Sequence, residues 1–438
     1  MSHPPERSAQ RQSWRSADPK DLRRHQLTRL NLLLHRAVSD HDFYRHKYAG
    51  IDLPLDSLDD ITRIPLLEKR EMLDDRTARI CGLSHDRYVR VHQTSGTTGR
   101  PLRVLDTAED WSWWLDCWQY ILDAANITPH DSAFLAFSYG PFIGFWTAHE
   151  SLVARGVKAI PGGGMDSVSR LNTIRECEAT VLCCTPTYAL HLIAVAARHG
   201  IDLPSGSIRK IIVAGEPGGS IPEVRSRIES AWGAQLIDHS GATEVGAWGF
   251  GTVDGKGLHV IESEFIAELL VFSDAEPHGR PANEGELSEL VITGLGRYGA
   301  PAIRYRTGDL VRGRRDDTLG NRFLVLDGGI IGRADNMVVV RGVNIFPSSI
   351  EAVVRQVAGN TEYRVIQSQV DAMTQLRVEI EVGQTGFTNA SELTAKLTAA
   401  LREQLGLRID VRSLPTGTLP RSEGKSKRWF VENGSRAS

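Results

Sequence analysis

Hydrophobic and polar positions divide the chain into stretches with different periods. In residues 21–50, leucines recur at helical spacing with arginines between them, which predicts an amphipathic helix. From Tyr88 to Trp232, short apolar runs such as SAFLAF and RKIIVAG alternate with helical stretches such as TYALHLIAVAARHG. Because strands that alternate with helices form parallel sheets with crossover helices, this region predicts an α/β core.

The pattern changes again toward the C-terminus. Residues Leu258 to Leu326 contain short strand-like runs without a long helical pattern, which predicts a β-rich subdomain. After Gly332, strand and helix patterns follow in an order that fits a small α+β domain of about one hundred residues. We therefore expect an α/β protein with a loose leader at 1–20, a large domain at 21–332 and a small domain at 333–438.

Composition excludes several classes of protein. The 51 Lys and Arg against 54 Asp and Glu give a net charge of −3, whereas a nucleic-acid-coating protein shows a basic excess. The longest apolar stretch, Phe134 to Trp146, contains Gly and Pro and is shorter than the roughly 18 residues of a membrane span. The N-terminus lacks the apolar core of a secretory signal. We expect a cytoplasmic protein with neither a nucleic-acid nor a membrane partner.

The cysteine pattern points to reduced thiols. The odd number of cysteines, without CxxC spacing, suggests neither a disulfide framework nor a zinc ribbon. We expect buried, reduced side chains at all of them: Cys81, Cys117, Cys177, Cys183 and Cys184.

A loop rich in hydroxyl side chains and glycine, TSGTTGRP, directly follows the predicted strand YVRVHQ. Its glycines permit a tight turn, and its hydroxyl and N–H groups can donate to anionic oxygens, so the loop can hold a phosphate. It is not a Walker A loop, because the spacing and the lysine are absent. Taken alone, it also fits an ordinary polar turn. The residues concerned are Thr94, Ser95, Gly96, Thr97, Thr98, Gly99 and Arg100.

Further polar segments each have two interpretations. In DHSGATE, after the expected strand AQLID, Thr243 and Glu244 could orient a phosphate and its Mg²⁺ or lie in a solvated loop. In YRTGD, Asp309 could accept two hydrogen bonds from a ribose diol or stabilise its own turn. In LPRSEGK, Lys425 would by itself be a solubility residue of a charged tail.

Five segments in this order resemble the adenylate-forming acyl-CoA synthetases, in particular phenylacetate-CoA ligases and their aryl-CoA ligase relatives: TSGTTGRP, HSGATE, YRTGDL, GRADNMVVVRGVN and LPRSEGK. Segments such as TPTYALHL and AGEP extend the resemblance over nearly the whole chain after residue 20. The resemblance implies a large N-terminal domain of stacked mixed sheets, a small mobile C-terminal domain, and an active site between them.

The resemblance also implies roles for individual residues. Thr94 to Gly99 would cradle the ATP β- and γ-phosphates, with Arg100 at a position where relatives often have Lys. Thr243 would contact the α-phosphate, Glu244 would bind Mg²⁺, and Lys425 would be the adenylation lysine. The remaining nucleotide contacts would be Gly215, Glu216, Pro217 and Ser240 around the adenine, Asp309 at the ribose, and Arg333 near the hinge residue Asp335.

The segment Phe137 to Trp146 matches the aryl-pocket region of the relatives. Aromatic side chains there could stack on a flat ring while glycines leave room for it, or they could simply form core. The implied acyl-pocket residues are Tyr139, Gly140, Phe142, Phe145, Gly241 and Ala242. A separate stripe of Trp111, Trp114, Leu115 and Trp118 on one helical face predicts core packing.

Two departures from the family pattern matter. Relatives commonly have an aromatic residue that stacks on adenine just before Gly-x-Thr-Glu, whereas this chain has Ser240, preceded by His239. Some relatives bind a structural zinc through cysteines, but residues 310–332 contain none. We therefore expect no metal except Mg²⁺, and we leave open what packs on the adenine.

The resulting hypothesis is an ATP-dependent enzyme that activates a carboxylic acid, expected to be aromatic, to an acyl-adenylate and then transfers the acyl group to CoA. One alternative is an adenylating enzyme with another acceptor, such as an amine or a carrier-protein thiol, or with another anion, such as nitrite. A second is a nucleotide-binding regulatory protein, against which Glu244, Asp309, Arg333 and Lys425 argue. A homodimer is left open.

Overall fold

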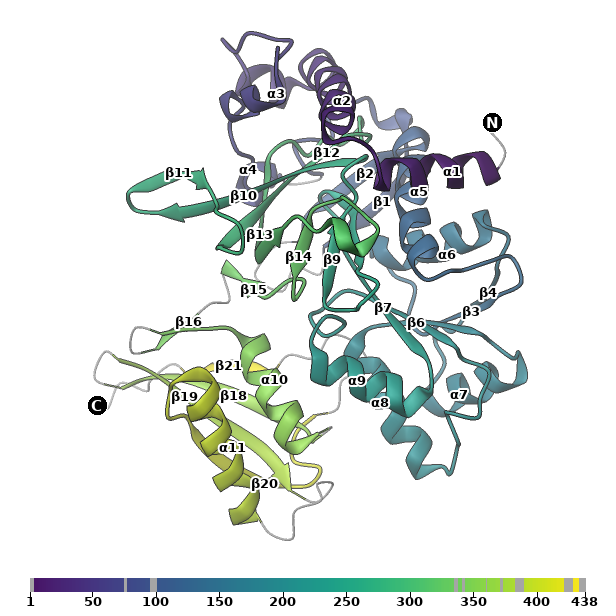
Figure 1. Ribbon diagram of the computed structural model, residues 1–438, viewed down its shortest axis with the longest axis vertical. Coiled ribbons are helices and arrows are strands. Elements are labelled where there is room, and N and C mark those ends of the chain that lie inside the picture. Colours follow the sequence, from purple (N-terminus) through teal and green to yellow (C-terminus); the bar gives the residue numbers. More distant parts are fainter. Residues whose placement is uncertain are drawn as a thin grey trace.

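The computed structural model is a mixed α/β protein with a large, sheet-rich N-terminal domain and a smaller C-terminal α+β domain (Figure 1), which confirms the predicted fold class. It describes residues 4–74, 77–94, 101–334, 338–340, 343–359, 361–370, 373–382, 390–420 and 428–432.

One long sheet organises the large domain. In the described part of the chain it has 13 strands in the order β11-β10-β12-β13-β14-β9-β8-β7-β6-β5-β3-β4, with β15 paired to β13. Strands β3 to β7 pair in parallel, as the alternation of strands and helices predicted, and β7 to β14 pair antiparallel. The strands are β3 (Ser132–Leu135), β4 (Lys158–Pro161), β5 (Val181–Cys184), β6 (Lys210–Val213), β7 (Gln235–Ala242), β8 (Gly246–Gly251), β9 (Gly257–Val260), β10 (Phe265–Ser273), β11 (Glu276–Pro281), β12 (Leu287–Gly294), β13 (Tyr305–Arg314), β14 (Val325–Asp327) and β15 (Gly332–Arg333).

Helices connect the parallel strands, as expected for crossover connections. Before these helices, α5 (Ala108–Ala124) leads from a separate hairpin into β3 and begins at a capping box in which Thr107 and Asp110 bond each other's backbone N–H groups. Its tryptophan stripe is buried, with Trp114 2% and Trp118 3% exposed, which confirms core packing. The crossover helices are α6 (Ile143–Ala154), α7 (Ser167–Glu176), α8 (Pro186–Arg198) and α9 (Pro222–Trp232).

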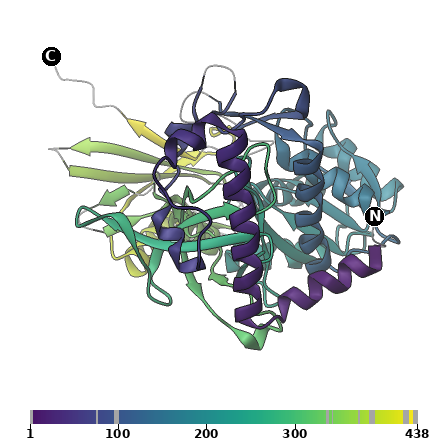
Figure 2. The same ribbon diagram turned by 90° about the horizontal axis from the view of Figure 1, so that it is seen from above.

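The N-terminal residues contain helices on both sides of residue 20. Residues 1–20, expected to be a loose leader, include α1 (Pro4–Arg15), and the Arg11 Nε lies 2.6 Å from Asp123 Oδ2 at the end of α5. This ion pair and Trp14, which packs against the core, attach α1 to the large domain, so no row of leucines marks the helix in the sequence. The amphipathic helix expected after residue 20 is α2 (Pro19–Asp40), which lies across the long sheet in Figure 2. Shorter helices follow: α3 (Asp42–Lys47), α4 (Lys69–Met72) and the 3₁₀ turns Leu58–Arg63, His85–Arg87 and Asp317–Leu319.

A separate hairpin and the small domain complete the fold. The hairpin consists of β1 (Tyr88–Gln93) and β2 (Arg103–Thr107), which pair antiparallel. In the small domain, helices cover a four-stranded sheet of order β20-β19-β18-β21 and bury an apolar core that includes Ile350 and Leu397. Its elements are β16 (Val338–Val340), β17 (Val343–Ile345), α10 (Pro347–Ala358), β18 (Tyr363–Val370), β19 (Met373–Val382), α11 (Ala390–Leu405), β20 (Asp410–Pro415) and β21 (Trp429–Glu432).

The cysteines and the surface bear on the predictions from composition. All five cysteines are free thiols, and Cys117, Cys183 and Cys184 are buried. Cys81 is half-buried and Cys177 is exposed, so the expectation of burial is wrong for Cys177, which caps the surface end of α7.

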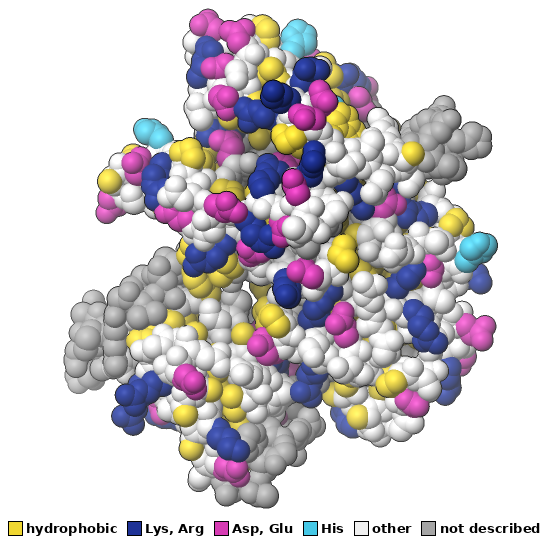
Figure 3. All heavy atoms as spheres, in the orientation of Figure 1, with side chains coloured by type: hydrophobic (Ala, Val, Ile, Leu, Met, Phe, Trp, Pro, Cys, Tyr) yellow, Lys and Arg dark blue, Asp and Glu magenta, His cyan; other side chains and the backbone are white. Residues whose placement is uncertain are grey.

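Figure 3 shows acidic and basic side chains interspersed over the displayed face. Among the helices that the structure describes, none is long and apolar enough to cross a membrane.

Candidate active site

Part of the predicted site lies at the carboxyl ends of the parallel strands. Because β3, β5, β6 and β7 run in the same direction, the segments that follow them meet at one edge of the sheet. These segments are the aromatic segment after β3, the start of α8 after β5, the loop 214–219 after β6, and the turn 243–245 after β7. Ligands of open α/β sheets bind at such an edge.

The base of the predicted phosphate loop is closed by two hydrogen bonds. Thr94 N donates to the carbonyl oxygen of Leu102 at 3.0 Å, and Leu102 N donates to the Thr94 hydroxyl, also at 3.0 Å. Gln93 N donates to the carbonyl oxygen of Pro141 at 2.7 Å, which joins the loop base to the aromatic segment. The other predicted residues of this loop, Ser95, Gly96, Thr97, Thr98, Gly99 and Arg100, lie outside the described residues.

Glu244 is nearly buried and already has a cationic neighbour. Its side chain is 7% exposed, and its Oε1 lies 3.0 Å from Lys69 Nζ. Tyr305 lies near Glu244; burial of this tyrosine, with the nearby Glu244 charge, raises its pKa well above the ordinary value. Lys69 comes close because Leu67, two residues earlier, forms a β-bridge with Tyr305. The segment PLLEKREM carries no pattern that would have predicted this contact.

The residues around Glu244 fit a Mg²⁺ site in which one carboxylate and the substrate phosphates share the ion. The described residues contain no cluster of three or more His, Cys, Asp or Glu side chains that could hold a metal. Mg²⁺ in nucleotide sites is usually bound by one or two carboxylates together with substrate phosphates. A single buried carboxylate at the sheet edge fits that mode, so Glu244 would hold Mg²⁺ jointly with ATP.

The loop 214–219 after β6 is anchored from both sides. Gly215 has φ +92°, a conformation that favours glycine. Glu216 Oε1 accepts a hydrogen bond from Thr187 N at 2.8 Å, and burial raises the pKa of this carboxyl. A Cβ at Gly219 would lie 2.4 Å from the carboxyl of Asp238, so the loop lies directly on β7. Gly215 and Pro217 remain exposed, as residues that border an adenine must be.

His239 does not replace the aromatic residue of the family pattern. Its Nδ1–H donates to the carbonyl oxygen of Gly249 at 2.8 Å, and its ring packs edge-on against Trp118 at 4.7 Å. Burial lowers the pKa of His239 to about 4, so the ring is neutral at physiological pH. Successive side chains of a strand face opposite sides, so Ser240 lies on the other face of β7 from this core histidine.

Asp309 and Arg333 form an ion pair between neighbouring strands. They are directly paired residues of β13 and β15, and Arg333 Nη1 lies 3.1 Å from Asp309 Oδ1. The hydrogen bond within the Asp309 turn runs instead from Asp309 N to the hydroxyl of Thr307 at 3.0 Å. The carboxylate therefore points to Arg333 rather than back to its own turn. The hinge residue Asp335 and the lysine Lys425 lie outside the described residues.

The aromatic segment forms a cluster at the sheet edge. Phe137 and Phe145 stack with ring centroids 4.4 Å apart, and Tyr139 packs edge-on against Trp146 at 4.9 Å. Phe142 is 38% exposed, and burial raises the pKa of Tyr139 to about 12. A Cβ at Gly144 would meet nothing within 4 Å, whereas one at Gly140 would lie 3.3 Å from Phe142.

The other predicted acyl-pocket residues lie on β7. A Cβ at Gly241 would lie 2.8 Å from the carbonyl oxygen of Gly246, so the strand pair leaves no space for a side chain there. Ala242 is half-buried and packs against the main core. The structure thus places Gly241 and Ala242 at the same sheet edge as the aromatic cluster. That the two groups form one acyl pocket remains a prediction.

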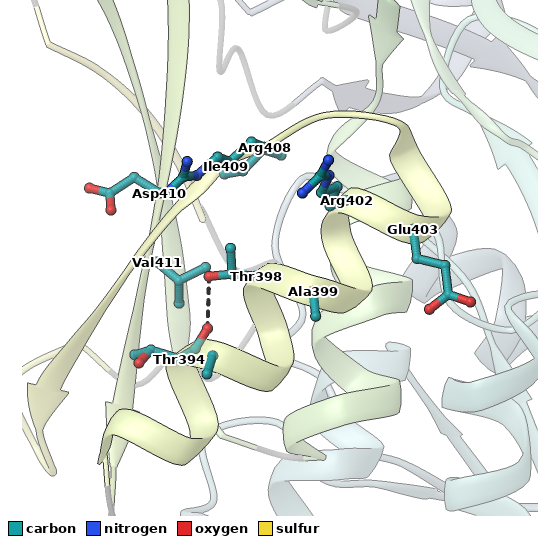
Figure 4. Close-up of a pocket in the computed structure, with 10 residues that line it drawn as sticks. Thr394, Thr398, Ala399, Arg402, Glu403, Arg408, Ile409, Asp410 and Val411 are labelled. Atoms are coloured by element: carbon teal, nitrogen blue, oxygen red, sulfur yellow. Dashed lines mark hydrogen bonds between the residues drawn. The ribbon is translucent and has the colours of Figure 1, made fainter.

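A pocket in the small domain lies apart from these residues. It has a volume of about 860 Å³ and is formed by α11 and the start of β20, with Thr394, Thr398, Arg402, Arg408 and Asp410 in its lining (Figure 4). None of the predicted site residues lines it. We assign it no part in the site.

Comparisons with known proteins agree on a family. The family model described as "AMP-binding enzyme" matches residues 54–287, and the model described as "AMP-binding enzyme C-terminal domain" matches residues 342–432. The curated phenylacetate-coenzyme A ligase of Escherichia coli (strain K12) is 30% identical over 430 residues, which cover 95% of this chain and 96% of that protein.

Solved structures of one ligase in two states match this chain to different degrees. A 2-hydroxyisobutyryl-CoA ligase in the postadenylation state, bound to R3-HIB-AMP, matches with a TM-score of 0.88 and 25% identity, covering 96% of this chain and 91% of that one. The same ligase in the thioesterification state, with 2-HIB-AMP and CoA, matches with a TM-score of 0.70 and 26% identity at the same coverage. At equal coverage, the TM-score is therefore higher for the postadenylation state.

Proposed function

We propose a function from the premise that this chain belongs to the family of AMP-binding enzymes: it is an ATP-dependent acid–thiol ligase. It activates a carboxylic acid to an acyl-adenylate with release of pyrophosphate, and then transfers the acyl group to the thiol of CoA. The similarity to phenylacetate-CoA ligases supports CoA as the acceptor, and the stacked aromatic cluster supports an aromatic acid as the substrate.

The chemistry follows from the leaving group. A carboxylate resists acyl transfer because its leaving group would be oxide, whereas in an acyl-adenylate the leaving group is AMP. To form the adenylate, a carboxylate oxygen attacks the α-phosphorus of ATP, and the bond to pyrophosphate breaks. Two anions must approach each other in this step, so catalysis requires positive charge and hydrogen-bond donors placed around the phosphates.

The residues of this chain supply those groups from separate segments. We assign the loop from Thr94 to Arg100 to the β- and γ-phosphates, Thr243 to the α-phosphate, and Lys425 to the charge that develops during adenylation. Glu244 would hold Mg²⁺, which supplies electrostatic stabilisation of the phosphates when bound. We assign Asp309 to the ribose and the exposed loop at Gly215 and Pro217 to the adenine.

The observation that carries the proposal is that the bases of two segments to which we assign phosphate binding are held together. The hairpin that leads into the Thr94 loop and the turn of Thr243 and Glu244 are far apart in sequence but are joined by Arg297, which bonds to Asp106 of the hairpin and to both carbonyl oxygens of the turn.

We also propose the division of the chain and its motion. The large domain would extend to residue 332, and the small domain, from 333, would turn about Asp335 between the two half-reactions. This turn would remove Lys425 after adenylation and admit the thiol. A cytoplasmic location and a homodimer remain predictions; sedimentation of the purified protein decides the second.

The test is acid-dependent exchange of labelled pyrophosphate into ATP, measured over phenylacetate, benzoate and a short aliphatic hydroxy acid. Mass analysis of the products with and without CoA follows. We expect exchange without CoA and an acyl-CoA product with it, with an aryl acid preferred. Exchange without any acyl-CoA would favour the alternative of another acceptor, and absence of exchange with every acid would refute adenylation of these acids.

A further inference from the structure

A buried arginine lies between the β1–β2 hairpin and the turn of Thr243 and Glu244. Arg297 follows β12, and only 1% of its surface is exposed. Its Nε donates to Asp106 Oδ1 at 2.7 Å. Its Nη1 donates to the carbonyl oxygens of Thr243 at 2.8 Å and Glu244 at 3.1 Å. One guanidinium therefore holds two segments that lie far apart in the sequence.

Asp106 provides the link to the phosphate loop. It lies on β2, which pairs with β1 across the residues that lead into and out of the loop. Burial alone would raise the pKa of Asp106, but the Arg297 guanidinium and His92 together outweigh burial and hold this pKa below its usual value. The pair is therefore a charged one in the interior of the protein.

The main chain after Arg297 is fixed as well. Asp110, in the first turn of α5, accepts hydrogen bonds from Tyr298 N at 2.7 Å and from Gly299 N at 3.1 Å. The guanidinium lies 5.4 Å from the ring centroid of Trp114. These contacts give the arginine a fixed position, so a displacement of either bonded segment would break hydrogen bonds.

This arrangement is costly if stability is its only purpose. A buried ion pair loses hydration, and apolar residues of similar volume often stabilise a protein as well or better. Within the described residues, Arg297 Nη2 has no hydrogen-bond partner, and His92 Nδ1 and Asp106 Oδ2 lie 3.6 Å apart, too far for a hydrogen bond. Buried polar atoms without partners add to the cost. A role in geometry explains why charged groups occupy this position.

We propose that Arg297 is a positioning residue for the adenylation half-reaction, because it sets the spacing between the β1–β2 hairpin, from which the Thr94 loop extends, and the turn of Thr243 and Glu244. This inference rests on the proposed function. The planar guanidinium bonds a carboxylate and two carbonyl oxygens at once, which the single ammonium of a lysine cannot reproduce. AMP lacks the β- and γ-phosphates and would meet only the turn, through its α-phosphate, so its binding should depend much less on this spacing.

The test compares Arg297→Lys with Arg155→Lys. Arg155 is a matched control, since it also bonds one carboxylate, Asp123 at 2.6 Å, and two carbonyl oxygens, those of Gln119 and Ile127, at 3.1 Å each. It precedes β4 and so lies at the amino ends of the strands, away from the site. Calorimetry without acid gives the affinities for MgATP and AMP, and a thermal melt confirms folding.

We expect Arg297→Lys to weaken MgATP binding and slow pyrophosphate exchange by about tenfold to a hundredfold, the loss typical of one hydrogen bond between charged groups. AMP binding and thioester formation from supplied acyl-adenylate should change less than about twofold, as should every property of Arg155→Lys. Equal losses for MgATP and AMP, or equal losses in both half-reactions, would overturn the inference.

A second variant covers the case in which Arg297→Lys does not fold. Asp106→Asn keeps the size of the side chain and removes the charge, so it should show the same selective loss of MgATP binding. Unchanged MgATP affinity in a folded Asp106→Asn would overturn the inference. If the wild-type protein shows no acid-dependent exchange, the proposed function fails, but the comparison of MgATP with AMP binding still decides the role of Arg297.

Discussion

At the scale of single residues, charge pairing around Glu244 connects burial to function. A nearly buried carboxylate is costly without a partner, and the Lys69 ammonium at 3.0 Å offsets that cost. Mg²⁺ bound at Glu244 would therefore compete with this ammonium for the same carboxylate. The site would gain its full affinity for the ion only when ATP phosphates provide further oxygen ligands.

Replacing Glu244 tests its assignment to the ion. Glu244→Gln keeps the size of the side chain but removes the charge, so the Mg²⁺ concentration for half-maximal exchange should rise about tenfold or more. The measurement is a Mg²⁺ titration of pyrophosphate exchange at saturating ATP and acid. AMP affinity serves as the control and should not change. An unchanged titration would place the ion elsewhere.

Asp238 predicts a pH dependence of stability. Burial raises its pKa from 3.8 to about 6, although Ser220 donates a hydrogen bond to it at 2.6 Å. Well below pH 4 the carboxyl is protonated in both the folded and the unfolded state, so it does not affect stability there. Because its pKa is higher in the folded state, ionisation at higher pH favours the unfolded state. Its cost to stability appears as the pH rises from about 4 to 6 and stays constant above, at roughly 3 kcal/mol.

The neutral variant Asp238→Asn should lack that cost. Urea unfolding of both proteins should show the variant gaining about 2 kcal/mol relative to wild type as the pH is raised from about 4.5 to about 7.5. A difference in unfolding free energy that does not change with pH would contradict the raised pKa. Because Asp238 lies beneath the 214–219 loop, AMP affinity of the variant reports whether the loop keeps its place.

Site residues that belong to local motifs could be predicted from the sequence. Residues near the site whose role depends on contacts with distant segments could not. Glu244 and Asp309 follow recognisable turns, so their positions could be predicted. Lys69 and Arg297 carry no motif, and their partners are distant in sequence; Arg297 and Asp106 are 191 positions apart. Only the folded arrangement of β-bridges and strand ends brings such residues together.

At the scale of elements, the alternation of strands and helices correctly predicted the parallel strands and therefore the edge where the site lies. The order of strands in the sheet could not be predicted in the same way, because it depends on pairing between segments far apart in sequence. Helix α1 shows a second limit: Arg11 reaches Asp123, a contact that hydrophobic periodicity does not report.

Gly144 in α6 allows stability and pocket shape to be tested together. A Cβ there meets nothing within 4 Å, so Gly144→Ala should stabilise the helix by roughly 0.5 to 1 kcal/mol. If the residue borders the acyl pocket, the added methyl group should lower kcat/KM for bulky aryl acids more than for small acids. The measurements are a thermal melt and kinetics over the acid panel. Equal kcat/KM losses for all acids would argue against the pocket assignment.

At the scale of the whole molecule, the chain matches two states of one solved ligase to different degrees. The match to the postadenylation state of the 2-hydroxyisobutyryl-CoA ligase is better than the match to its thioesterification state. Helix α10 of the small domain packs against α9 of the large one in this structure. The second half-reaction would then require the small domain to leave α9.

Fluorescence energy transfer between the domains tests this motion. Cys177 is exposed on the large domain, and the small domain contains no cysteine in its sequence, so Ser391→Cys on α11 provides a second labelling position. We expect a change in transfer efficiency when CoA is added to protein that holds a non-hydrolysable acyl-adenylate analogue, and none with AMP alone. Constant efficiency under both conditions would contradict the rotation.

Adenylation of the carboxylate can be measured directly by following an oxygen label from the acid into AMP. The wild-type protein is incubated with ATP, CoA and an accepted acid whose two carboxylate oxygens are ¹⁸O, and the AMP is analysed by mass spectrometry. Attack of the carboxylate on the α-phosphorus predicts that AMP retains one labelled oxygen after the thioester forms. AMP without label, formed in amounts equal to the acyl-CoA, would contradict the account.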